Sequence, residues 1–126
     1  MTSRVLVVGS NVESMHGVRT ALEARGLAVQ SASDGPSALA SLELQRPDVI
    51  LLEVDMPQMT GMEVLDRIRA NPQQTGIPVI LMAEGAGDDD LLEGYKFGAD
   101  YYLTKPFSPR HLLYAVGLVL GREFPE

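Results

Sequence analysis

Two carboxylates follow a continuous apolar run near the middle of the chain. Glu53 and Asp55 come after residues 49–52, and Met56-Pro57 then forces the backbone into an extended turn. Such a run is typical of a strand buried on both faces of a parallel sheet. Sites in open α/β sheets form outside the carboxyl ends of the strands, so we expect the chemistry of this chain to lie around Glu53.

Other residue types that could bind a metal do not combine into a site. His16 and His111 lie in different predicted helices, and no second ligand stands at metal spacing from either. The aspartates at 88–90 lack the alternating spacing and the final glutamate of a calcium loop, and suit a helix N-terminus. The chain has no cysteine, which excludes disulfides and cysteine-based zinc sites.

Composition favours one globular domain whose partners are proteins or small cations. The chain has 126 residues, of which 45% are apolar and 21% charged. Its net charge of −7 argues against direct binding to nucleic acid, which needs a basic face. No apolar run reaches the roughly 18 residues of a membrane span, so we expect a cytoplasmic protein that does not bind membranes.

Five strand–helix units position the candidate residues. Strands are expected at 4–8, 27–32, 49–52, 77–82 and 101–104, each followed by a helix start signal. These signals are Ser10 or Asn11, Asp34 with Pro36, Thr60 with Glu63, the aspartates at 88–90, and Ser108-Pro109. Strict alternation predicts a parallel α/β sheet with helices on both faces. We expect one domain over 1–122, with 123–126 as a tail or the start of a linker.

At this point four segments point to a family. RVLVV, PDVILLEVDMPQMTG, IPVILM and GADYYLTKPF, in this order and at these spacings, resemble the receiver domain of bacterial two-component response regulators. The resemblance implies a flavodoxin-like, doubly wound, five-stranded sheet of order 2-1-3-4-5. It also implies phosphoryl transfer to an aspartate after strand three, with magnesium held by that aspartate and an acidic pair after strand one.

The chain departs from the family pattern at four of these site positions. The phosphoacceptor position is Glu53, and the acidic pair falls on Gly9 and Ser10. The hydroxyl position after strand four is Ala83. The site lysine with its proline (Lys105, Pro106) and the switch aromatic (Tyr102) are kept.

These departures predict an ion pair between Glu53 and Lys105 that needs no metal. A standard site sets three carboxylates against one lysine, an excess that magnesium relieves, whereas Glu53 and Lys105 can neutralise each other. We therefore expect magnesium to be absent or weakly bound, with Asp55 as the one remaining carboxylate. Two interpretations of Glu53 stay open: a pairing that holds strands three and five, or a fixed charge that partly imitates a phosphorylated aspartate.

The tyrosines indicate a surface for protein partners. Tyr102 is expected in one fixed rotamer because Ala83 offers no hydroxyl, and Tyr101 should face the opposite side of the strand. Tyr95, Tyr101 and Tyr114 are expected on the face of the fourth helix, fifth strand and fifth helix, which receivers use for partners and homodimers.

Three functions are compatible with these observations. The first is a pseudo-receiver, not an enzyme, that signals by protein–protein interaction without phosphorylation. The second is a working receiver phosphorylated on Glu53 or Asp55. The third, of another class, is a flavodoxin-like domain in which Gly9, Ser10, Asn11 and Ser14 cradle a phosphate-bearing ligand at a helix N-terminus.

Overall fold

The fold is a parallel sheet of five strands. The computed structural model describes residues 2–84, 95–96 and 98–124. The strands are β1 (Arg4–Val8), β2 (Ala28–Ala32), β3 (Val49–Glu53), β4 (Val79–Glu84) and β5 (Tyr101–Lys105). They pair in the order β2-β1-β3-β4-β5, which confirms the predicted topology. The sheet order reverses between β1 and β3, so a crevice is expected at their carboxyl ends.

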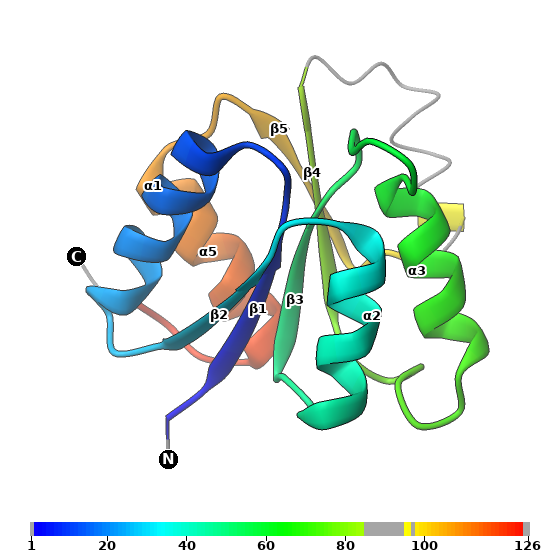
Figure 1. The fold of residues 1–126 in the computed structure, drawn as a ribbon. Helices are drawn as coiled ribbons and strands as arrows, with labels where there is room; N and C mark the ends of the chain where they lie inside the picture. The colour runs from blue at the N-terminus through cyan, green and yellow to red at the C-terminus, as the bar shows by residue number, and fades with distance from the viewer. Residues whose placement is uncertain (1, 85–94, 97, 125–126) are drawn as a thin grey trace.

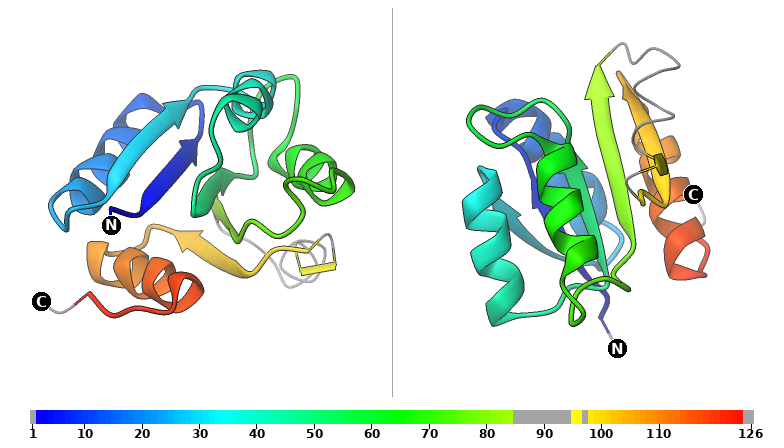
Figure 2. Two further views of the ribbon diagram at one scale, coloured as in Figure 1. Left: turned by 90° about the horizontal axis from the view of Figure 1, so that it is seen from below. Right: turned by 90° about the vertical axis from the view of Figure 1, so that its right-hand side faces the viewer.

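Helices cover both faces of the sheet. Helices α1 (Val12–Glu23) and α5 (Pro109–Leu120) lie on one face, and α2 (Gly35–Leu44) and α3 (Gly61–Ala70) on the other (Figure 1, Figure 2). Two buried apolar clusters fill the two layers, and every residue of β3 is buried. The helix predicted to begin at the aspartates 88–90 lies outside the described residues.

Side-chain caps begin the helices where the sequence places them. The side chains of Asn11, Asp34, Thr60 and Ser108 each accept a hydrogen bond from the backbone N–H three residues later. At Asp34, the bond donated by the Ser37 backbone lowers the pKa of the carboxyl group. The structure selects Asn11 over Ser10 as the first cap.

The limits of four strands differ from the sequence prediction, and two of these, β3 and β5, only extend by one residue, to Glu53 and Lys105. β4 was expected at 77–82 but runs from Val79 to Glu84. Ile77 is buried, yet its N–H bonds to the Gln74 carbonyl in a turn, and Pro78 has no N–H to give to a ladder. Ala83 and Glu84 extend the strand by pairing with β5. β2 starts one residue late, because Leu27 still bonds back to Leu22.

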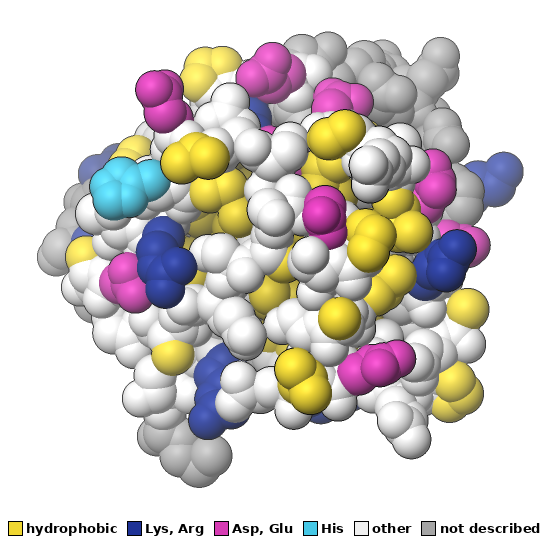
Figure 3. All heavy atoms as spheres, in the orientation of Figure 1, with side chains coloured by type: hydrophobic (Ala, Val, Ile, Leu, Met, Phe, Trp, Pro, Cys, Tyr) yellow, Lys and Arg dark blue, Asp and Glu magenta, His cyan; other side chains and the backbone are white. Residues whose placement is uncertain are grey.

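Charged side chains are dispersed over the surface. Figure 3 shows acidic groups spread across one face and separated by apolar and basic ones.

Within the described part of the chain, no helix is both long and apolar enough to cross a bilayer.

Candidate functional site

A buried ion pair occupies the carboxyl ends of the central strands. The Lys105 Nζ donates to Glu53 Oε1 at 3.0 Å, and the two side chains are only 14% and 8% exposed. Glu53 ends β3 and Lys105 ends β5, with β4 between them, so the pair spans a strand. The predicted pairing is therefore confirmed, and it joins two strands that share no backbone hydrogen bonds.

The second oxygen of Glu53 lies under Gly9. Glu53 Oε2 is buried and has no hydrogen-bond partner among the residues that the structure describes. A Cβ at Gly9 would overlap Oε2 and would lie 2.8 Å from both Glu53 Cδ and the Met15 sulfur. No side chain fits at position 9 while Glu53 keeps this conformation. The absence of an acidic side chain at position 9 therefore fits the presence of glutamate, the longer carboxylate, at position 53, because the two side chains would occupy the same space.

The turn after β3 holds Glu53 at its backbone. Gly61 donates to the Val54 carbonyl at 2.8 Å, and a Cβ at Gly61 would overlap the Glu53 carbonyl oxygen. Only glycine permits this close approach of the α3 N-terminus to the end of β3. Gln58 supports the turn with a φ of 70°, in the left-handed region.

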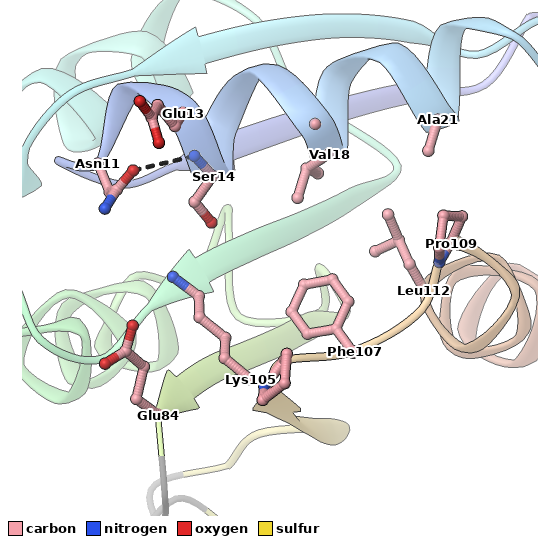
Figure 4. A pocket seen from close by; sticks show the side chains of 12 residues that line it. Asn11, Glu13, Ser14, Val18, Ala21, Glu84, Lys105, Phe107, Pro109 and Leu112 are labelled. Atoms are coloured by element: carbon pink, nitrogen blue, oxygen red, sulfur yellow. Dashed lines mark hydrogen bonds between the residues drawn. The ribbon is translucent and has the colours of Figure 1, made fainter.

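The loop after β1 is engaged with its own helix. Gly9 donates to the Ala32 carbonyl, and Asn11 Oδ1 accepts from the Ser14 N–H at 2.9 Å (Figure 4). Ser10 is exposed. The Asn11 side chain already accepts the hydrogen bond of the Ser14 N–H. A phosphate group bound at this helix N-terminus, as the sequence suggested, would have to displace the Asn11 side chain.

A small hollow lies beside the ion pair, and its lining includes the carboxylates of Asp55 and Glu84 besides Glu53. It encloses about 200 Å³ and is lined by Ser10, Asn11, Glu53, Asp55, Met82, Ala83, Glu84 and Lys105. The positions of the acidic pair bring no carboxylate, and one Glu53 oxygen bonds to Lys105 while the other is buried under Gly9. Among the described residues, no three His, Cys, Asp or Glu side chains are grouped to hold a metal ion.

Glu84 is a site residue that the sequence analysis missed. Its backbone is in register with Lys105 across the β4–β5 ladder, and the residue lines the hollow. Glu84 also borders a groove of about 530 Å³ between α1 and the segment that links β5 to α5 (Figure 4). The sequence could have indicated Glu84 only through the length of strand four. A strand extended by two residues beyond position 82 would have placed Glu84 at its carboxyl end, beside the site.

The switch positions are both buried. Ala83 is 6% and Tyr102 7% exposed, and both belong to the apolar cluster beneath α2 and α3. The Tyr102 side chain therefore lies inward although position 83 offers no hydroxyl. Pro106 follows Lys105 through a cis peptide bond and is exposed.

The three other tyrosines lie near one another on the opposite side. Tyr101 packs in the cluster beneath α1 and α5, which confirms that it faces away from Tyr102. Burial raises the pKa of Tyr101, with smaller contributions from the charges of Tyr114 and Tyr95. Its hydroxyl lies 3.1 Å from His111 Nε2, and Tyr95 and Tyr114 are 46% and 60% exposed. The structure thus brings the predicted aromatic residues together.

Comparisons with known proteins agree with this architecture. A family model described as the response regulator receiver domain matches residues 5–117. The alkaline phosphatase synthesis transcriptional regulatory protein PhoP of Bacillus subtilis is 35% identical over 122 residues, covering 97% of this chain and 50% of PhoP. The sensory transduction protein RegX3 of Mycolicibacterium smegmatis is also 35% identical, over 97% of this chain and 52% of RegX3.

Solved structures show the same fold. The chemotaxis protein CheY4 of Vibrio cholerae superimposes with a TM-score of 0.91 at 33% identity, covering 95% of this chain and all of that one. The chain spans about half the length of the curated relatives it matches. Its sheet order, its retained lysine and its matched residues show that the chain belongs to the response regulator receiver domain family.

Proposed function

We propose that this chain is a receiver-type signalling module that does not accept a phosphoryl group and acts through protein–protein interaction. The observation that carries this proposal is the Glu53–Lys105 pair with Glu53 Oε2 buried under Gly9. Glu53 Oε2 is buried, and an incoming phosphorus atom would have to displace the Lys105 bond to reach Oε1. The acceptor position is therefore blocked by its own neighbours.

The electrostatics support the same conclusion. A phosphoryl transfer needs cations to offset the charge of the phosphate oxygens, and receivers use magnesium together with the lysine. Here Lys105 already neutralises Glu53, and Gly9 and Ser10 supply no carboxylate for a magnesium ion. We expect magnesium binding at this hollow to be absent or weak.

The buried switch positions favour a fixed surface. Tyr102 lies inward beside a cluster that contains Ala83, so its position does not depend on a hydroxyl bound to phosphate. Signalling would then depend on how much of the domain and its partners is present, and not on a change of conformation. The contact surface would be the face that carries Tyr95, Tyr101 and Tyr114. Tyr95 and Tyr114 expose large apolar area there, as interface tyrosines do.

Intact-mass measurement after incubation with acetyl phosphate and Mg²⁺ tests the proposal. We expect no gain of a phosphoryl group by the unmodified chain. The matched positive control is the combined variant Gly9→Asp, Ser10→Asp, Glu53→Asp and Ala83→Thr, which restores the family residues and is expected to be phosphorylated.

A competing function is phosphorylation of Asp55. Its side chain is exposed and lines the hollow, so it is the accessible carboxylate of β3's end. Stoichiometric phosphorylation of the unmodified chain would refute the proposal. Loss of that adduct in Asp55→Asn but not in Glu53→Gln would assign it to Asp55.

A further inference from the structure

The outer edge of β2 lacks the features that usually keep the edge of a sheet from pairing. Among the described strands, β2 is the outermost on its side of the sheet, and it pairs with β1 (Figure 2). Its sequence, AVQSA, contains no charged residue and no proline. The register with β1 is continuous from Ala28 to Ala32, so no bulge turns the strand away. Proteins normally protect an open edge with one of these features, because its unpaired N–H and C=O groups can bind another strand.

Two residues of β2 direct their backbone groups toward this open edge. Ala28 donates a hydrogen bond to the residue before β1, and Ala32 accepts one from the Gly9 N–H after β1, so both face β1. Neighbouring residues of a strand alternate in this respect, so Val29 and Ser31 face outward. Their N–H and C=O groups are the ones that another strand would use.

Arg19 of helix α1 bonds to the two residues that face outward. Its guanidinium donates to the Val29 carbonyl and to Ser31 Oγ, each at 3.0 Å. Glu23, one turn further along α1, places its Oε1 3.4 Å from Arg19 Nε and helps to orient the side chain. The Val29 carbonyl is therefore occupied, and a positive charge stands at the edge of a strand that has none of its own.

The α2 side of β2 is open along the same residues. A hollow of about 310 Å³ follows Ala28, Val29 and Gln30, and Ser41 and Gln45 of α2 form part of its wall. Ala28 and Gln30 are exposed. The described residues of α2 thus leave this side of the edge uncovered, and the contact that closes the edge comes from α1.

The outward groups of β2 are complementary to those of a second copy. In an antiparallel arrangement centred on Gln30, Val29 would exchange both of its free backbone bonds with Ser31 of the second copy, and Ser31 with Val29. Gln30 would stand opposite itself as an uncharged pair. Such a two-fold contact uses the same edge of both copies, so it closes at a dimer.

We infer that the edge of β2 is a pairing surface for a second copy of this chain, and that Arg19 keeps it closed. Pairing would require the guanidinium to leave both the Val29 carbonyl and Ser31 Oγ. The inference goes beyond the proposed function, because β2 lies at the opposite edge of the sheet from β5 and its tyrosines. It does not depend on whether a carboxylate of the candidate site accepts a phosphoryl group.

Disulfide crosslinking at position 30 tests this inference. The chain has no cysteine, so Gln30→Cys introduces a single thiol. Directly opposed residues in a non-hydrogen-bonded antiparallel pair have Cα atoms about 4.5 Å apart, a separation that a disulfide can span. With diamide as the oxidant, we expect Gln30→Cys combined with Arg19→Ala to form the crosslinked dimer about tenfold faster than Gln30→Cys alone, because pairing no longer breaks the Arg19 bonds.

Matched variants separate pairing from chance collision and from loss of stability. Leu44→Cys places the thiol on a helix residue that is 87% exposed on α2, and Arg19→Ala should leave its crosslinking rate unchanged. Arg67→Ala removes an arginine from α3 and should not speed crosslinking at position 30.

Sedimentation of chains without cysteine gives a second readout. Arg19→Ala should sediment as a dimer at concentrations where the unmodified chain does not pair through β2. Adding Gln30→Lys should abolish that dimer, because the two lysines would stand opposite each other at its centre.

Three results would overturn the inference. Equal crosslinking rates at position 30 with Arg19 and with Arg19→Ala would show that Arg19 does not close the edge. An equal rise in the rate for Leu44→Cys would attribute the effect to a general loss of stability. A dimer of Arg19→Ala that persists with Gln30→Lys would place the contact on another surface.

Discussion

Among the residues that the structure describes, two ion pairs join distant parts of the chain, and they differ in how completely their polar atoms are bonded. Arg69 pairs with Asp100 at 2.9 Å at the amino ends of β4 and β5, and its other N–H groups donate to the carbonyls of Thr75, Ile77 and Gly98. Asp100 also accepts from the Val79 N–H. Lys105 and Glu53, at the opposite ends of the strands, share one bond, and Glu53 Oε2 has no hydrogen-bond partner in the described part of the chain.

The difference separates a pair that stabilises the fold from a pair at the candidate site. Full bonding favours stability, because each buried polar atom left unpaired costs about 1 to 3 kcal/mol. The Arg69 network ties α3, the start of β4 and the turn before β5 together. The Glu53–Lys105 pair stands at the candidate site and leaves one buried oxygen unbonded among the described residues.

Removing Arg69 should have the largest effect on stability. Arg69→Ala leaves three carbonyls without this donor and removes the cation beside Asp100, so we expect the free energy of unfolding to fall by about 4 kcal/mol. Urea denaturation followed by circular dichroism measures it. Arg67→Ala, an exposed neighbour on α3, is the control and should change little. A loss below 1 kcal/mol for Arg69→Ala would contradict the structural role.

Removing Lys105 should cost somewhat less. Lys105→Met keeps the length of the side chain but leaves a buried carboxylate without its cation, and we expect a loss of about 3 kcal/mol at neutral pH. The double variant Lys105→Met with Glu53→Gln removes both charges and should recover part of that loss. If the single and double variants unfold at the same urea concentration, the pair does not neutralise charge as described.

Filling the space at Gly9 should have the smallest of the three effects. Gly9→Ala places a methyl group on Glu53 Oε2, and overpacking of this kind costs about 2 kcal/mol. Combining it with Glu53→Asp shortens the opposing side chain, so the two substitutions together should destabilise less than their sum. Additive effects in this double-mutant cycle would show that positions 9 and 53 do not share the same space.

Particular residues show how far the sequence alone could predict the molecule. Apolar runs and capping residues predicted the five strands and the helix starts, because both depend on local patterns. The sheet order followed from the family resemblance. Strand four was misplaced because burial continues into the turn at Ile77, while Ala83 and Glu84 join the ladder without an apolar signal. The Glu53–Lys105 pair followed from the family resemblance together with charge.

Other features of the site depend on contacts that no local pattern reports. Gly9, directly after β1, lies so close to the Glu53 side chain at the end of β3 that a Cβ there would overlap it. From the sequence, position 9 shows only that an acidic residue is absent. The Arg69 network joins α3 to residues about 30 positions away, and arginine in a helix is otherwise typical of an exposed face. The Gly9–Glu53 contact and the Arg69 hydrogen bonds could be found only in the structure, because each joins atoms of separate helices, strands or turns.

The close approach of Glu53 to Gly9 also means that the two positions constrain each other's side-chain volume. An aspartate introduced at position 9 alone would collide with the glutamate, and an aspartate introduced at position 53 alone would leave empty volume beneath Gly9. Either single substitution is therefore expected to give a less stable protein than the paired change. A mutational path between the two residue sets would have to cross that loss of stability.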